Sequence, residues 1–452
     1  MLRFVDGARL GRREFLRVAP LGLAALGLGR GSARGDGPVP GLVTGKSVIF
    51  LFLHGGPSQF ETFDPKMDRP EGIRSAIGEI PTKLPGVTFG SSFPGLASLA
   101  DRLTIVRSFE PGDADHNIKP LVGRDTFQAN PGAILAQAAG GNHPITGLPT
   151  NVLLLPRSVD PTTGPGTMSF GKFASVGSLS AASAPYDPSA GASTVELPRE
   201  RLGDRHHLLG ELDALARRLE RLEGVDRLRD QAFRLLDGGL AEAFDLNRED
   251  PRLVDRYDTA PLVRPDAIDK KWKNYNHYVD NAKSLGKLLL LARRLCERGA
   301  GFVTVTTNFV WDMHADENNA PMGEGMRYMG PPLDHALSAF VEDLHARGLQ
   351  DRILLVACGE MGRTPRINGK GGRDHWGKLG PLLLAGGGMP GGRVIGRSDR
   401  DGAAPQSEPI TGKNLAATIL HTLFDVGQFR LVPNLPREFT QTMAGWEPIP
   451  MG

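Results

Sequence analysis

The 452-residue sequence contains only two cysteines, and this scarcity excludes a disulfide-built scaffold. Cys296 and Cys358 both lie in apolar surroundings, one in an expected helix and one in an expected strand, so we expect buried free thiols rather than a bridge. The chain also lacks an excess of one charge, because its formal net charge is only +2. Its few surplus basic residues are spread along the chain, which argues against nucleic acid as a partner.

Long hydrophobic runs and several familiar motifs are missing as well. Beyond the N-terminal segment, no apolar run reaches the ~20 residues that cross a bilayer, so no membrane span is expected in the mature chain. The sequence has no internal repeat and no G-x-S-x-G nucleophile elbow, although its "HGG" is similar to the oxyanion loop of esterases. What remains, 40% hydrophobic and 23% charged, suits one large α/β domain with insertions, or two domains.

The N-terminal segment, residues 1–38, resembles a twin-arginine export signal. Arg12 and Arg13 precede an apolar stretch, Val18–Leu28, that is too short to span a bilayer, and small residues follow it. We therefore expect an exported protein, periplasmic or extracellular, in which residues 39–452 form the mature α/β domain. The alternative is a basic amphipathic segment that is not a signal.

Short apolar runs recur along the mature chain. They are continuous rather than alternating, which is typical of strands buried on both faces of a largely parallel sheet. Helical patterns lie between them, as in residues 333–347 and 412–425, so we expect a three-layer α/β sandwich. The expected strands are 47–53, 103–108, 151–156, 302–307, 352–358 and 379–385.

Residues 200–298 differ from the rest in composition. They are rich in Leu, Arg, Glu and Asp and contain two long amphipathic patterns. We expect a helical insertion there that covers the edge of the sheet or forms a lid. The Gly-, Ser- and Ala-rich residues 158–193 before it read as an irregular loop.

Carboxylate and imidazole side chains follow four of the expected strands. Because ligands in parallel α/β sheets bind beyond the carboxyl ends of the strands, we expect these side chains to meet at one edge. A single histidine in such a place is more often a capped or core residue, but the common position favours a shared site. The side chains that follow these strands are His54, Ser58, Glu61, Asp113, Asp115, His116, Asp312, His314, Glu360, Arg363, Asp374 and His375.

Imidazole with carboxylate ligands fits zinc, manganese or iron, whereas carboxylates alone fit magnesium or calcium. Asp312 and His314 lie two residues apart in an expected loop, so both can turn towards one ion. Glu360 and His375 could complete the ligand set, and His54 is a weaker candidate. A bound ion would lower the pKa of water and supply a nucleophile near neutral pH.

Two arginines, Arg363 and Arg373, follow the strand at 352–358. A guanidinium group binds phosphate or sulfate through two points and stabilises charge in a transition state. The alternative role is a salt bridge that braces the loop, with Glu360 or Asp374 as the partner.

The order of these motifs resembles the alkaline-phosphatase/sulfatase superfamily, and within it an uncharacterised family of twin-arginine-exported, sulfatase-like proteins, a domain of unknown function. The similarity runs over nearly the whole mature chain. The segments that carry it are "RREFLR", "FLFLHGGPSQFETFDPK", "DHNIKPLVGR", "WDMHADEN", "LDHALSAFVEDLHARGLQDRILLVACGEMGRTPRIN" and "GRDHWGKLGPLLLAGGG".

This resemblance implies an alkaline-phosphatase-like fold and hydrolysis of phosphate or sulfate esters. It implies a divalent metal, zinc, manganese or calcium, held by Asp312, His314, Glu360 and His375. The implied substrate is a small anionic ester or a sulfated or phosphorylated polymer.

The sequence departs from the superfamily pattern in three places. "HGGPSQFET" follows the first strand where aspartate ligands are usual, and Met361 follows Glu360 where His or Asn is usual. The segment "DADHNIKP" has no Cys, Ser or Thr to act as nucleophile. His116 is therefore the expected base or nucleophile, with Arg363 and Asp374 as further catalytic residues. The alternatives are a catalytically inactive binding or scaffold protein and a hydrolase of another bond, such as an amide.

Overall fold

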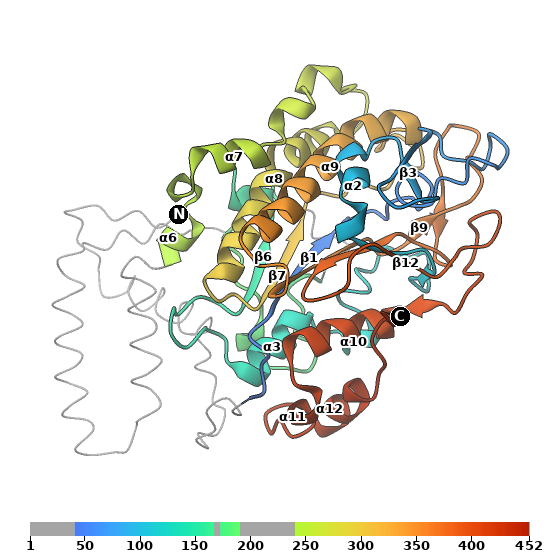
Figure 1. The fold of residues 1–452 in the computed structure, drawn as a ribbon. Helices are drawn as coiled ribbons and strands as arrows, with labels where there is room; N and C mark the ends of the chain where they lie inside the picture. The colour runs from blue at the N-terminus through green and yellow to red at the C-terminus, as the bar shows by residue number, and fades with distance from the viewer. Residues whose placement is uncertain (1–40, 167–171, 190–239, 452) are drawn as a thin grey trace, which may run out of the picture.

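The computed structural model describes residues 41–166, 172–189 and 240–451 (Figure 1). The expected export signal lies outside the described residues, as do residues 190–239, which include the first part of the expected insertion. Within the described ranges, no helix combines the length and the apolar character needed to cross a membrane.

A seven-stranded sheet forms the centre of the fold, with the strand order β12-β4-β11-β8-β1-β7-β6. Six of these strands run in one direction, and β11 is antiparallel to both of its neighbours, so the predicted largely parallel sheet is confirmed. Each expected strand overlaps an observed one. The bounds are β1 Ser47–Phe52, β4 Thr104–Val106, β6 Asn151–Leu154, β7 Phe302–Thr306, β8 Ile353–Cys358, β11 Leu382–Gly386 and β12 Arg393–Ile395.

Helices cover both faces of this sheet (Figure 1). Along β1, Ile49 and Leu51 belong to the core on one face, and Phe50 and Phe52 belong to the core on the other. Each face of the sheet thus packs against helices through its own hydrophobic core, and the sheet and its two helical layers form the predicted three-layer sandwich. The first core includes α2 Pro94–Ser98, α8 Tyr275–Glu297 and α9 Met322–Ala346, and the second includes α3 Pro131–Ala139, α10 Gly412–Leu423, α11 Val426–Phe429 and α12 Arg437–Ala444.

Short elements complete the described chain. Three small two-stranded sheets pair β2 with β3, β5 with β13, and β9 with β10. Their bounds are β2 Glu79–Pro81, β3 Thr88–Gly90, β5 Phe109–Glu110, β9 Gly362–Arg363, β10 His375–Trp376 and β13 Ile410–Thr411. The 3-10 turns are η1 Ala100–Arg102, η2 Arg124–Thr126, η3 Pro156–Ser158, η4 Ala181–Ser183, η6 Leu246–Arg248, η7 Ala260–Leu262 and η8 Pro265–Ala267.

Helix α9 begins eleven residues before the expected start at 333, and it contains Pro331 and Pro332. A pair of prolines normally marks the first turn of a helix, because proline lacks the N–H that later turns require. Here Met326 and Met329 of the earlier turns are buried in the core. Burial of these side chains offsets the backbone hydrogen bonds that the prolines remove.

The described part of the expected insertion, with α6 Leu240–Phe244 and α7 Pro251–Tyr257 before α8, is helical. Helix α8 lies in a layer of the sandwich, beside α9. The fully buried Arg293 of α8 forms ion pairs with Glu249 at 3.1 Å and with Asp343 of α9 at 3.0 Å. Cys296 in α8 and Cys358 in β8 are buried free thiols, as predicted.

Replacing Gly286 in α8 with alanine is expected to destabilise the protein. An alanine Cβ there would lie 1.6 Å from the carbonyl oxygen of Tyr257, so α7 and α8 would have to separate. We expect a loss of about 1–3 kcal/mol in the free energy of unfolding, measured by urea titration. Gly323→Ala in α9 is the matched control, because its Cβ meets nothing within 4 Å. An equal effect of the two substitutions would contradict this packing.

Candidate metal centre

One edge of the sheet collects most of the expected site residues. The parallel strands β1, β4, β7 and β8 all end at this edge, and the antiparallel β11 begins there. The short ribbon β9–β10 precedes β11 and pairs His375 with Arg363. The loops at this edge carry His54 after β1, His116 after β4, Asp312 and His314 after β7, Glu360 after β8, and His375 before β11.

Three of these side chains, His116, Asp312 and His375, bring one possible ligand atom each to a common point. His375 Nε2 lies 3.0 Å from Asp312 Oδ1 and 3.1 Å from His116 Nε2. His116 Nε2 lies 3.7 Å from Asp312 Oδ1. Atoms at these separations lie on a circle of about 1.9 Å radius, close to the distance of about 2.0–2.1 Å that zinc keeps from nitrogen and oxygen ligands, so these three side chains could hold such an ion.

The donor set also bears on the choice of metal. Two imidazole nitrogens and one carboxylate oxygen suit zinc or manganese, whereas calcium takes six to eight oxygen ligands. The residues that meet here therefore fit a transition-metal cation better than calcium.

The carboxylate of Asp312 contacts several other side chains of this centre. Its Oδ2 faces His314 Nε2 at 2.9 Å, and its Oδ1 accepts a hydrogen bond from Arg363 Nη2 at 2.6 Å. Burial alone would raise the pKa of Asp312, but hydrogen bonds with His314 and His375 and the charge of Arg363 hold it well below its ordinary value. The carboxylate is thus kept ionised and ready to bind a cation.

His314, an expected ligand, contacts the other oxygen of the same carboxylate and is not one of the three converging groups. Its ring centroid lies 5.5 Å from that of His375. The hydrogen bond to Asp312 raises the pKa of His314, so this carboxylate favours the protonated imidazole.

Glu360 and His54, also expected as ligands, lie around the converging groups rather than among them. The fully buried Glu360 faces Nδ1 of His116 at 2.9 Å. His54 is fully buried among aromatic rings, with centroid distances of 4.9 Å to Phe309 and 5.5 Å to Phe173. Burial lowers the pKa of His54.

Arg363 differs from its expected role in binding a substrate anion. Its side chain is fully buried, and besides Asp312 it donates to the carbonyl oxygens of Gly56 at 2.8 Å, Arg373 at 3.3 Å and Gly55. In this arrangement the guanidinium joins three loops and has no surface open to a substrate. It braces the site, with Asp312 as partner rather than Glu360 or Asp374.

Arg373 braces the neighbouring loop in the same way. It is fully buried, and its Nε lies 3.1 Å from Glu61 Oε2. Asp374, an expected catalytic residue, is exposed and accepts a hydrogen bond from Asn368 at 3.0 Å. The side chain of His375, the first residue of β10, contacts Asp312 and His116, whereas that of Asp374, which precedes the strand, contacts Asn368.

Residues 45–434 match a family described as "Protein of unknown function (DUF1501)". The chain belongs to this family. No curated protein matches the sequence. Among solved structures, the phosphonate monoester hydrolase of Agrobacterium radiobacter aligns at 14% identity over 80% of this chain and 74% of that chain, with a TM-score of 0.23. That score is too low to carry an argument about function.

From the sequence, His116 of this DUF1501 chain is expected to be catalytic and not a metal ligand, whereas in the structure its Nε2 is one of the three converging atoms. The signal for ligation was present, since His116 follows a strand at the same edge as the other candidates. Gly55 was also missed, although its amide donates to both oxygens of Glu360. Gly55 has a φ of +114°, and a Cβ on this residue would lie 2.5 Å from the amide nitrogen of Asp312. The "HGG" sequence is thus explained by close approach of two loops.

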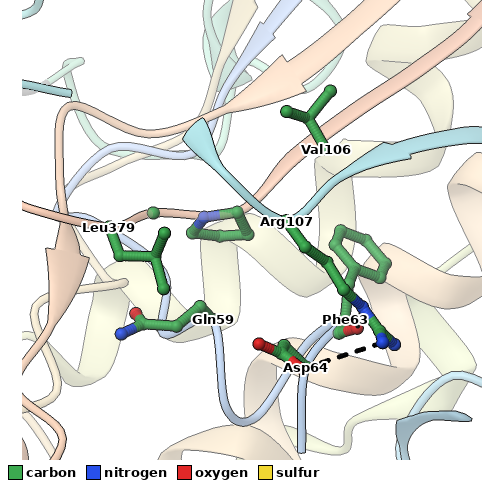
Figure 2. Close-up of a pocket in the computed structure, with 8 residues that line it drawn as sticks. Gln59, Phe63, Asp64, Val106, Arg107 and Leu379 are labelled. Atoms are coloured by element: carbon green, nitrogen blue, oxygen red, sulfur yellow. Dashed lines mark hydrogen bonds and ion pairs between the residues drawn. The ribbon is translucent and has the colours of Figure 1, made fainter. Parts of the chain in front are cut away.

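A small cavity elsewhere in this DUF1501 chain contains none of the converging ligands (Figure 2). Arg107 lines it, 3.8 Å from Asp64, and donates from Nε to the carbonyl oxygen of Phe63 at 2.8 Å. The cavity therefore belongs to the packing beneath β4. Its lining residues are Gln59, Phe63, Asp64, Val106, Arg107, Leu379, Gly380 and Pro381.

Replacing Arg363 with glutamine is expected to destabilise the metal-free protein by about 3–5 kcal/mol, because the buried charge of Asp312 loses its fully buried cationic partner. Chemical denaturation with chelator present measures this loss. Arg256→Gln is the control, since Arg256 pairs with Glu342 where both side chains are about two-fifths exposed. Such pairs contribute about 0–1 kcal/mol. Similar losses for both variants would contradict the bracing role.

The stabilising contribution of His314 is expected to fade as pH rises. Its folded-state pKa is raised above the ordinary 6.5, so the contribution is fully present below pH 6.5 and is lost as pH rises through the folded-state pKa. The stability difference between wild type and His314→Gln, measured in chelator by urea unfolding, should shrink across that range.

His421→Gln is the control for this pH dependence. Burial lowers the pKa of His421. The contribution of His421 to folding stability is therefore lost as pH falls, which is the reverse of the dependence expected for His314. A difference for His314→Gln that grows with pH would contradict the ion pair with Asp312.

Proposed function

We propose that this chain is a metal-dependent hydrolase of phosphate or sulfate esters that is exported through a twin-arginine signal. The observation that carries the metal centre is the convergence of His116 Nε2, Asp312 Oδ1 and His375 Nε2 at the carboxyl edge of the sheet. The class of ester comes from the resemblance of the sequence motifs to the alkaline-phosphatase/sulfatase superfamily.

Three protein ligands leave a coordination position for water or substrate, as catalytic zinc sites do. The centre is accessible from one side, because the side chain of His375 is 33% exposed, whereas that of His116 is 12% exposed. A bound divalent cation would polarise an ester oxygen and lower the pKa of water to near neutrality.

The chain's own side chains have distinct tasks in this proposal. Asp312 would hold the cation through Oδ1, and the hydrogen bond from Arg363 keeps the Asp312 carboxylate in place. His314, with 26% of its side chain exposed, binds the anionic group of the substrate, because Arg363 is fully buried and cannot reach it. Because residues 113–120 contain no hydroxyl or thiol, we propose attack by water instead of a covalent intermediate.

A second candidate is an exported metal-binding protein without catalytic activity. It is favoured by the complete burial of Arg363 and Arg373, which leaves neither guanidinium open to an anionic ester. Met361 favours it too, since a thioether is a poor ligand for a hard ion.

Metal analysis and an ester assay distinguish these candidates. The exported, processed protein should retain one zinc or manganese ion per chain after dialysis, and a chelator should lower its melting temperature. At an ion concentration about 100 times Kd, binding contributes about 2.7 kcal/mol to stability. Asp312→Asn and His375→Ala should abolish stoichiometric binding.

The assay uses p-nitrophenyl phosphate, bis-p-nitrophenyl phosphate and p-nitrophenyl sulfate. Turnover that falls with chelator and returns with zinc or manganese supports the hydrolase. Stoichiometric metal without turnover supports the second candidate, and absence of metal contradicts the centre itself. Asp101→Asn is the control, because Asp101 forms a surface pair with Lys83.

A further inference from the structure

We propose that Glu360 is a positioning residue that fixes the orientation and tautomer of His116, and that it is not itself a metal ligand. This inference rests on the proposed function in one respect, namely that a cation binds between His116, Asp312 and His375.

Glu360 is held in place before any ion is considered. It is fully buried two residues beyond the end of β8. The amide N–H of Gly55 donates to Oε1 at 2.9 Å and to Oε2 at 3.1 Å. Both carboxylate oxygens therefore have a donor from the loop after β1, and the group has little freedom to swing towards the common point.

The hydrogen bond between Glu360 and His116 determines which ring nitrogen carries the proton. Oε1 of Glu360 lies 2.9 Å from Nδ1 of His116. In the arrangement we propose, the Nδ1–H of His116 donates to Oε1 of Glu360, and Nε2 keeps the lone pair. Nε2 is the atom that faces His375 and Asp312, at 3.1 Å and 3.7 Å. Glu360 thus turns His116 into a ligand aimed at the common point.

The same contact explains why Glu360 is outside the ligand set. The two ring nitrogens of an imidazole point away from each other, so a carboxylate bonded at Nδ1 lies across the ring from an ion at Nε2. A carboxylate in that position orients the ring, fixes its tautomer and raises its basicity towards the metal. Phe309 supports the ring from another side, in an edge-to-face contact with a centroid distance of 4.6 Å.

The first test is a double-mutant cycle on zinc affinity, measured by competition with a chromophoric chelator. Glu360→Gln keeps the size of the side chain and should weaken zinc binding by about 10–100-fold. In a His116→Ala background, the same substitution should change affinity by less than about 3-fold, because the ring through which it acts is gone. An equal loss in both backgrounds would overturn the inference and make Glu360 a direct ligand.

Glu342→Gln is the matched control, since it removes a carboxylate that is 43% exposed and pairs with Arg256. Its zinc affinity should equal that of wild type, and a comparable loss would show that the effect of Glu360→Gln is not specific.

The second test needs no variant to fold. Nitrogen-15 NMR of histidine-labelled wild-type protein with zinc should show His116 bound through Nε2 and protonated at Nδ1. Binding through Nδ1 would overturn the inference while leaving the metal centre intact. Failure of the wild type to bind zinc would overturn the proposed function and this inference together.

Discussion

The ionised carboxylate of Asp312 is the group on which the candidate centre depends. Only 7% of its side chain is exposed, so its charge must be balanced by groups from other parts of the chain. Arg363 and His314 supply two of them, at 2.6 Å and 2.9 Å, and His375 supplies a third at 3.0 Å. Because these partners come from the loop after β7, from β9 and from β10, one buried charge requires separate segments of the chain to fold together.

The direction of the strands makes this meeting possible. Parallel strands deliver the ends of β1, β4, β7 and β8 to one edge, and the antiparallel β11 lets His375 arrive there from the segment that precedes a strand. The loops after β1 and β7 approach each other so closely that one position requires a residue without a side chain. Gly55 accepts a φ of +114° and leaves room for the backbone of Asp312, while its amide binds Glu360. Topology thus sets which residues meet, and glycine sets how closely they approach.

Much of this arrangement could be predicted from the sequence, because continuous apolar runs mark buried strands and each candidate follows or precedes one. The roles of individual side chains were harder to predict. Asp374 and His375 are adjacent, yet only His375, which pairs with Arg363 in the β9–β10 ribbon, contacts the centre, and the sequence does not indicate which of the two does. Arginine is a residue type that often binds anionic ligands, but Arg363 and Arg373 each pair with a buried carboxylate of this chain. The spacing of residues in the sequence does not indicate these partners. Helix α9 extends beyond its prolines because tertiary packing outweighs local preference.

The buried charges at this edge constrain the groups around the three converging atoms. Asp312 and Glu360 place two carboxylates in the interior, and the nearby buried Arg363 offsets one of them. Glu360 and Arg363 are both tied to the backbone around Gly55, so neither can move to relieve the imbalance. In the absence of a cation, the 3.0 Å contact between His375 Nε2 and Asp312 Oδ1 is a hydrogen bond donated by the imidazole, and a bound cation would take the place of that proton. The surrounding hydrogen bonds therefore keep His116, Asp312 and His375 close enough together that one atom from each could bind the same cation.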